Sequence, residues 1–444
     1  ETDMTQGKIL LPLVSFTIPL VLGNLFQLTY NAADSVIVGK YVGEQALAAV
    51  GTSTPIMNIA ILLISGMCMG ASVLMSSQYG AKDYDTLSRQ ISTTMLAGCG
   101  FSVVFSLLML LLANPVLRLI RVPETAIPEA AAYLRIIFMG LIFTFMYNFL
   151  ANTMRALGDS KTPLYFLVTS AFLNIFGDLF FVVVLRWGVA GSAIATVCSE
   201  GLCCLLCGIY IKKKIPLLCL GKKWWVFDKS LLGKTVSYGS TSAMQQVCLQ
   251  LGKLIIQSVV NTQGVAVMAA FTAVNRVDDF AYTPQQNIGH AMTTFLAQNK
   301  GAGHKERMKK GFQTGLLIEL VYSIGLFCVI WGLAPQIMTL FAEDGDAQVV
   351  SLGISYLHLI SWMYILPGLT NGVQGFFRGI GDLKVTLYST FMNMFGRVVA
   401  VFVMIRLLQM EFASLAWANM VGWIVMLLFE VPLLVKSMRN GECG

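Results

Sequence analysis

A few acidic and polar side chains interrupt apolar stretches in the first half of the sequence. Asp34 is the only charged residue between positions 11 and 38. In a later apolar stretch, Asn174 and Asp178 stand four residues apart, and Thr196 lies in the stretch after that. Residues at i and i+4 of a helix share one face. Asn174 and Asp178 are therefore expected to present an amide and a carboxylate to the same neighbour.

These oxygen-bearing groups have the chemistry of a site for a small cation. A carboxylate inside a membrane costs about 2.5–3.5 kcal/mol on insertion scales, and it usually faces a partner or a cavity. Carboxylate, amide and hydroxyl oxygens together can hold a proton or a hard cation such as Na⁺. We predict a cation-coupling site at Asp34, Asn174, Asp178 and Thr196, with Glu200 as an accessory group. The alternative is that the two aspartates only make hydrogen bonds that support packing.

The composition identifies the class of protein. Of the 444 residues, 56% are hydrophobic and 12% are charged, whereas soluble domains carry roughly 25% charged residues. Apolar stretches of about 20 residues, the length that crosses a bilayer, recur along the whole chain. The alternating polarity typical of barrel strands is absent. We therefore expect an all-α polytopic membrane protein.

Polar and turn-rich breaks divide the chain into twelve expected transmembrane helices. These cover residues 12–38, 47–76, 91–112, 130–153, 163–185, 189–211, 235–260, 266–297, 312–333, 348–374, 384–408 and 412–435. Most of the 30 Lys and Arg residues fall at the termini and in the even-numbered loops, and the segment 212–234 is especially basic. By the positive-inside rule, both termini are cytoplasmic. This distribution indicates contact with anionic membrane lipids and no nucleic-acid partner.

The second half of the chain repeats the first. The motif SQYGAKDYDTLSR at 77–89 has the counterpart AQNKGAGHKERMKK at 297–310, and RALGDSKTPLY at 155–165 returns as RGIGDLKVTLY at 378–388. Because six spans separate the copies, each pair of motifs lies on the same side of the membrane. The halves are therefore parallel repeats, an arrangement typical of secondary transporters.

This repeat predicts the domain organisation. We expect a first six-helix bundle at residues 1–211, a basic cytoplasmic linker at 212–234 and a second six-helix bundle at 235–444. The two pseudo-symmetric bundles would enclose a central cavity, as in secondary transporters. A purely structural duplication is the alternative.

The acids of the first half have no counterparts in the second. Arg397 takes the position of Asp178 in the repeat, the seventh span carries Lys253 and the ninth carries Glu319. A single ion site in the first bundle is the simplest interpretation. We expect Lys253 and Arg397 to form ion pairs with Glu319, with acidic substrates as alternative partners.

Two further features concern movement and substrate. Pro19 interrupts the first span, and an interior proline removes a backbone hydrogen bond and permits a kink. A helix that bends during function is one interpretation, and a static bend is the other. Methionine and aromatic side chains suit an adaptable cavity lining, although they also serve in ordinary packing. The candidate lining residues are Tyr30, Met57, Met67, Phe143, Tyr147, Met244 and Asn275.

Several motifs, taken in order, resemble the MATE (multidrug and toxic compound extrusion) family and in particular its DinF-like bacterial branch. They are IPLVLGNLFQLTYNAADSVIVG, RALGDSKTP, LNIFGD, GVAGSAIAT and RGIGD. The resemblance covers essentially the whole chain. It implies an antiporter that exports organic drugs or metabolites, cationic or amphipathic, by alternating access and driven by inward movement of H⁺ or Na⁺.

The resemblance also assigns residues. In the DinF-like branch the ion site uses an Asp of the first span, an Asn and an Asp of the fifth and a Thr of the sixth. These fall on Asp34, Asn174, Asp178 and Thr196, and the branch's bending proline falls on Pro19. NorM-like members carry acids in spans seven and ten, where this sequence has none. A second-half ion site of that type is therefore not expected.

The resemblance implies no cofactor besides the coupling ion, and a place in the bacterial inner membrane. One chain holds both bundles, so a monomer suffices. No metal centre is expected either. Cys204 and Cys207 have CxxC spacing, but they lie in an apolar stretch without a second pair, which favours core packing.

Other functions stay open. A flippase for a lipid-linked sugar or another amphiphile is the principal alternative, and Lys253, Arg276 and Arg397 hint at the cationic cavity that it would use. A membrane-embedded enzyme would need a motif such as HExxH or GxSxG, and neither occurs. A channel would not need a pair of titratable carboxylates in one bundle.

Overall fold

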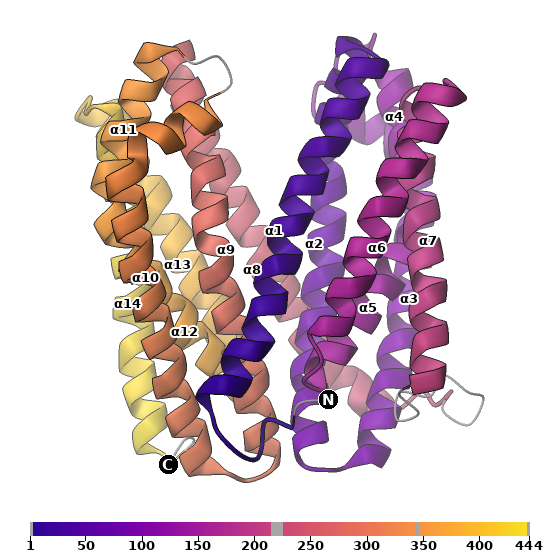
Figure 1. Ribbon diagram of the computed structural model, residues 1–444, viewed down its shortest axis with the longest axis vertical. Coiled ribbons are helices and arrows are strands. Elements are labelled where there is room, and N and C mark those ends of the chain that lie inside the picture. The colour runs from indigo at the N-terminus through magenta and orange to yellow at the C-terminus, as the bar shows by residue number, and fades with distance from the viewer. Residues whose placement is uncertain (1–2, 215–224, 343–345, 442–444) are drawn as a thin grey trace. The chain divides into compact units, whose positions relative to one another are not determined.

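The computed structural model describes residues 3–214, 225–342 and 346–441, apart from a few side chains. The side chains outside the described part are those of Tyr30, Ser35, Glu44 and Leu47. Within these ranges the chain forms helices joined by short connections, and no strand occurs (Figure 1). The expected all-α class is confirmed.

The first half of the chain contains six membrane-length passes. They are α1 (Leu10–Tyr41), α2 (Glu44–Gly80), α3 (Tyr84–Leu119), the pair α4 (Ile127–Met139) and α5 (Leu141–Ala156), α6 (Lys161–Asp178) with the π-helical η1 (Leu179–Val184), and α7 (Val189–Lys214).

The second half repeats this order. Its helices are α8 (Lys229–Val260), η4 (Asn261–Gln263), α9 (Val265–Gly301), α10 (Lys305–Phe341), α11 (Ala347–Ser361), η5 (Trp362–Tyr364), α12 (Ile365–Ile380), α13 (Leu383–Phe402), the π-helical η6 (Val403–Leu407), η7 (Phe412–Ser414) and α14 (Leu415–Arg439). In both halves the fifth pass ends in a π-helical segment, so the repeat extends to this irregular feature.

All twelve expected spans correspond to membrane-length passes in the described ranges. Nine helices there are long and apolar enough to cross a membrane, and the bent pair α4–α5 makes a tenth. The other two passes, α8 and α9, have 32 and 37 residues but are more polar. Polar side chains within a span usually face protein or a water-filled cavity, so these two helices are the ones expected to be least exposed to lipid.

The fourth pass is bent rather than straight. We predicted one span at 130–153, but α4 and α5 meet at an angle of 48°. Gly140 separates them, and a Cβ atom at this position would lie 2.6 Å from the side chain of Val197 on α7. The bend therefore occurs where close packing against α7 requires a glycine.

Contacts divide the chain into two compact units. Of the described residues, those between Ile18 and Ala243 form the first unit, and Asp3–Thr17 together with those from Met244 onward form the second. The predicted linker at 212–234 falls partly outside the described residues, since 215–224 are not among them. The division between the units falls further on, inside α8, and it also assigns the start of α1 to the second unit. Packing at the two ends of these helices explains both differences.

The start of α8 packs against α2 through glycines. A Cβ atom on Gly66 would lie 2.6 Å from the Cα of Ala243, and one on Gly70 would lie 2.5 Å from the backbone of Tyr238. Small residues four positions apart let two membrane helices approach closely. The first turns of α8 therefore belong to the first unit, although they follow the basic segment.

The segment before α1 is held by the second unit. The Arg307 guanidinium donates hydrogen bonds to the carbonyl oxygens of Met4 at 3.0 Å, Gln6 at 3.0 Å and Gly7 at 2.6 Å. The side-chain amide of Asn299 also donates to the Met4 carbonyl, at 3.1 Å. These charge-assisted bonds to carbonyls of residues 4–7 fix the chain just before α1 begins.

We expect the substitution Arg307→Ala to release this segment without unfolding the protein. The carbonyls of Gln6 and Gly7 would lose their Arg307 donor, and Met4 would keep only Asn299. Amide hydrogen exchange in residues 4–8 should therefore become at least about tenfold faster, since bonds to charged groups contribute about 1.5–3 kcal/mol. Hydrogen–deuterium exchange with mass spectrometry measures this directly. Lys309→Ala, at an exposed position on the same helix, is the matched control. Equal exchange in both variants would contradict the anchoring role.

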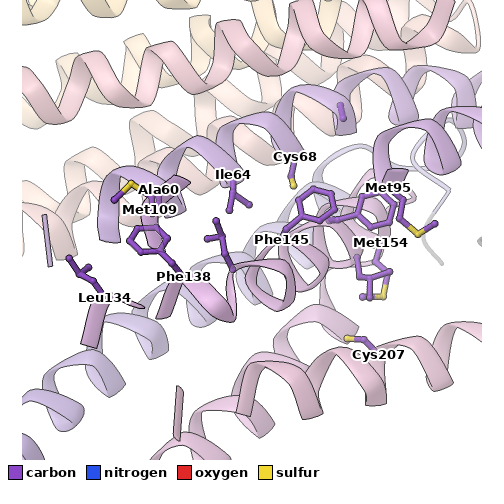
Figure 2. Close-up of a cluster of buried hydrophobic side chains, with 14 of the residues drawn as sticks. Ala60, Ile64, Cys68, Met95, Met109, Leu134, Phe138, Phe145, Met154 and Cys207 are labelled. Carbon is purple, nitrogen blue, oxygen red and sulfur yellow. The ribbon is translucent and has the colours of Figure 1, made fainter. Parts of the chain in front are cut away.

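The core of the first unit is a continuous apolar cluster, shown in Figure 2. Side chains from five helices meet there: Ala60, Ile64 and Cys68 of α2, Met95 and Met109 of α3, Leu134 and Phe138 of α4, Phe145 and Met154 of α5, and Cys207 of α7. Cys207 is thus a core residue, as its apolar surroundings in the sequence predicted, whereas Cys204 is half-buried and its thiol lies 3.1 Å from the Phe143 carbonyl oxygen.

Candidate functional site

Asp178 ends α6 and is the most deeply buried member of the predicted cation site. Its side chain is 0% exposed, and within the described residues neither carboxylate oxygen has a hydrogen-bond partner. Gly177 brings α6 close to α7, because a Cβ atom there would lie 3.0 Å from the Cβ of Ala195. Such close packing keeps water and lipid away from this carboxylate.

Asn174 and Thr196 meet across the same α6–α7 contact. The Thr196 hydroxyl lies 3.5 Å from Oδ1 of Asn174 and 3.1 Å from the carbonyl oxygen of Ser192. Asn174 is 6% exposed and lies one turn before Asp178 on the same helix. The structure therefore brings three of the four predicted ligands together at one helix–helix contact.

Asp34 lies on α1, which runs beside α6. A Cβ atom on Gly23 would lie 3.4 Å from Leu167 and 3.6 Å from Leu164, and the rings of Phe26 and Phe172 lie 6.4 Å apart. The contacts advance in the same direction along both helices, so α1 and α6 run parallel. Continuing this register from Phe26 to Asp34 leads to the C-terminal end of α6, the level of Asp178.

Asp34 itself is partly buried, and its Oδ1 atom has no hydrogen-bond partner in the described part of the chain. A buried carboxylate without donors is costly unless it is neutralised. Asp34 and Asp178 share this property, which the sequence could not show.

Tyr133 of α4 lies near two acids of the predicted site, a placement that the sequence interpretation did not foresee. Its side chain is within electrostatic range of both Asp34 and Glu200, and its hydroxyl lies 3.9 Å from Sδ of Met57. A single tyrosine in the stretch AAAYLR carried no signal, because only the packing of α4 against its neighbours brings it here.

Glu200 has a partner of its own. The hydroxyl of Thr144 on α5 donates to its Oε2 at 2.6 Å. This bond joins α5 to α7, one turn beyond Thr196. Glu200 therefore differs from the two aspartates, because one of its oxygens is already satisfied by the protein.

Pro19, the residue predicted to bend the first span, lies close to a change in the contacts of α1. Pro19 lies within α1 and is buried. The division of α1 between the two units falls between Thr17 and Ile18, directly before this proline. The missing backbone hydrogen bond thus coincides with the point where the contacts of α1 change.

The candidate cavity residues lie in both units. In the first unit, a Cβ atom on Gly239 would lie 3.2 Å from the Cα of Met67. The Tyr147 hydroxyl lies 3.5 Å from the Pro163 carbonyl, and Phe143 is 39% exposed beside Gly201. Met57 is placed by its contact with Tyr133. In the second unit, Met244 is 54% exposed and Asn275 is half-buried. The side chain of Tyr30 lies outside the described residues, so these candidates remain predictions.

Within the described ranges, no group of three or more His, Cys, Asp or Glu side chains is placed to hold a metal ion. The first unit instead offers carboxylate, amide and hydroxyl oxygens, from Asp34, Asp178, Asn174 and Thr196. This donor set suits a proton or a hard monovalent cation.

Comparison with known proteins supports one family. The family model described as MatE matches residues 19–180 and again residues 242–403, so the repeat recognised in the sequence is confirmed. The probable multidrug resistance protein YpnP of Bacillus subtilis is 32% identical over 388 residues, covering 87% of this chain and 86% of that protein.

A more distant relative and a solved structure agree with this result. The probable multidrug resistance protein NorM of Thermotoga maritima is 23% identical over 423 residues, with 93% and 89% of the two chains covered. A multidrug resistance MATE family transporter solved in an outward-facing conformation matches with a TM-score of 0.91 at 22% identity, covering 99% of this chain and 98% of that one. At that identity the structural match shows the fold.

Proposed function

This chain belongs to the MatE family of membrane transporters, and on that premise we propose that it exports organic cations or amphiphiles in exchange for H⁺ or Na⁺. Its relatives are transporters rather than enzymes. The proposed ion site comprises Asp34, Asn174, Asp178 and Thr196 in the first unit. The protein would act as a single chain in the bacterial inner membrane, with both termini in the cytoplasm.

One observation carries the proposal of cation coupling. Asp178 is completely buried, and both of its oxygens lack a donor in the described residues. A carboxylate in that setting is stable only when a proton or a metal cation neutralises it. Gain and loss of that cation would change the energy of the α1–α6–α7 contact and shift the population of conformations.

The moving element in this proposal is α1. It carries Asp34 toward α6, and Pro19 interrupts its hydrogen bonding where its contacts pass from one unit to the other. A change in the charge state at Asp34 would therefore act on a helix that is already weakened at one position.

Transport in liposomes tests this function. Purified protein would be reconstituted with a fluorescent organic cation such as ethidium, and a pH gradient and a sodium gradient would be imposed separately. We expect movement of the dye under one of the two gradients, which identifies the coupling ion. The substitution Asp34→Asn should reduce this movement to the level of protein-free liposomes.

The control for this experiment is Glu124→Gln, which removes a carboxylate whose side chain is 80% exposed. Gradient-driven transport by well-folded Asp34→Asn protein would disprove the coupling role of Asp34. Equal dye movement with and without either gradient would disprove antiport.

The second candidate is a flippase for a lipid-linked sugar or another amphiphile. One observation favours it, because Lys253 and Arg397 line a common cavity in the second unit. Arg276, the third cation of the sequence interpretation, lines a different cavity of that unit. Transbilayer movement of a fluorescent lipid-linked sugar in the absence of any ion gradient would support this function over antiport.

A further inference from the structure

The second unit contains a cavity of about 140 Å³ between α8, α9, α12, α13 and α14. Three cationic side chains line it, Lys253 of α8, Arg378 of α12 and Arg397 of α13. No aspartate or glutamate is among the described residues of this lining. The surface of the cavity is therefore positively charged, within a unit that is otherwise largely apolar.

These cations are not neutralised by ion pairs. In the described ranges, no carboxylate oxygen lies within 4.0 Å of Lys253, Arg378 or Arg397. The expected ion pairs of Lys253 and Arg397 with Glu319 are therefore absent there. Glu319 is instead buried beside Gly368, where a Cβ atom would lie 3.5 Å from its Oε2.

Both guanidinium groups have hydrogen-bonding capacity left unused. Arg397 is 9% exposed and lies over the ring of Trp423, 5.5 Å from its centre, and its Nε has no hydrogen-bond partner in the described residues. Arg378 is 4% exposed and donates from Nε to the Thr293 hydroxyl at 3.2 Å. Its Nη2 is likewise without a partner.

Acids near the cavity compensate this charge only from a distance. Glu430 is within electrostatic range of Arg378, Asp278 is within range of Arg397 and Lys253, and Asp279 is within range of Lys253. Asp278 accepts a hydrogen bond from the Tyr364 hydroxyl, and none of these three acids lines the cavity. Buried guanidinium groups without a carboxylate in direct contact are costly, so an anion in the cavity would be stabilised by both arginines.

Neutral donors complete the wall of the cavity. The side-chain amides of Gln245 and Gln374 lie 3.1 Å and 3.2 Å from the hydroxyl of Thr390. This shared hydroxyl holds α8, α12 and α13 together beside the arginines. Lys253 and Gln286 are exposed members of the lining, so a ligand can reach the cavity from outside the unit.

We propose that this cavity is a binding site for an oxyanion, the phosphate or carboxylate group of a small molecule. Arg378 and Arg397 would donate hydrogen bonds to its oxygens, and Lys253 would supply a third positive charge at the mouth. Guanidinium groups match the geometry of both oxyanions. As a statement about the exported molecule, this site rests on the proposed export function and adds a negatively charged or zwitterionic group to its substrate class.

Binding to the full-length protein in dodecyl maltoside micelles tests this site without any ion gradient, so a failure of transport would not affect the result. The probes are monododecyl phosphate, inorganic phosphate and dodecyltrimethylammonium, titrated at constant ionic strength. Tryptophan fluorescence follows occupancy, because Trp423 contacts Arg397. We expect saturable binding of monododecyl phosphate and none of the dodecyltrimethylammonium cation at the same site.

Substitutions locate the binding. Arg397→Gln should weaken the affinity at least about tenfold, since bonds to charged groups contribute about 1.5–3 kcal/mol, whereas Arg397→Lys should retain most of it. Arg406→Gln removes an exposed arginine from the extension of the same helix and should leave the affinity unchanged. Lys253→Gln, at an exposed position, provides a second variant if Arg397→Gln does not fold.

The two anionic probes distinguish a soluble anion from the head group of an amphiphile. Equal binding of inorganic phosphate would identify a soluble anion, and binding of monododecyl phosphate alone would identify the head group of an amphiphile. Both results support the oxyanion site. Binding of neither probe, or equal affinity in wild type and in both the Arg397→Gln and Lys253→Gln variants, would overturn it.

Discussion

Replacing Asp178 by asparagine is expected to abolish gradient-driven export while leaving the fold at least as stable as that of the wild type. The carboxylate is 0% exposed, and it accepts no hydrogen bond from the described residues. The amide has nearly the same shape, so the substitution removes a buried charge without removing a bond. An unpartnered buried charge is costly, and replacement of buried charged groups by neutral ones of similar volume is often neutral or stabilising.

Two measurements on the Asp178→Asn variant distinguish a loss of ion coupling from a loss of stability. Transport in liposomes should fall to the background of protein-free vesicles, and the thermal unfolding temperature in detergent should equal or exceed that of the wild type. Glu124→Gln serves again as the exposed control and should change neither quantity. A lower unfolding temperature for Asp178→Asn would instead assign Asp178 a structural role, and unimpaired export would remove it from the ion site.

The second large effect is expected where α2 meets α8. A methyl group on Gly70 would lie 2.5 Å from the backbone of Tyr238, and no flexible side chain is there to move aside. Overpacking of this kind costs about 1–3 kcal/mol, and occasionally more. We therefore expect Gly70→Ala to lower the unfolding temperature and the yield of monodisperse protein.

Gly51 is the matched control on the same helix. It is exposed, and a Cβ atom there would meet nothing within 4 Å. Alanine is favoured over glycine inside a helix by about 0.8–1.0 kcal/mol, so Gly51→Ala should raise the unfolding temperature. Size-exclusion chromatography after heating measures both variants. A stable Gly70→Ala protein would show that α2 and α8 can separate without cost.

The sequence by itself determined the features that depend on local geometry. The twelve spans follow from the length and polarity of each apolar stretch, and the repeat follows from motifs that return in the same order. The pairing of Asn174 with Asp178 follows from the pitch of a single helix. None of these required knowledge of which helices are neighbours.

Only the tertiary structure decided which side chains meet between helices. Contacts such as Tyr133 near Asp34 and the absence of a partner for Asp178 depend on the rotation of each helix about its axis. That rotation is set by close approaches at single glycines, such as Gly177 against Ala195. Apolar periodicity is nearly uniform around a membrane helix, so the sequence does not indicate which face turns inward.

The cationic side chains of the second unit give the clearest example of a grouping that the sequence did not predict. Lys253 and Arg397 were expected to pair with Glu319, because an unpaired charge within a span is costly. The structure directs Lys253 and Arg397, together with Arg378, into one cavity and buries Glu319 elsewhere. The sequence shows how many charged residues the spans of the second half carry. Their grouping was decided by the packing of five helices from distant parts of the chain, a non-local property that no sequence motif encodes.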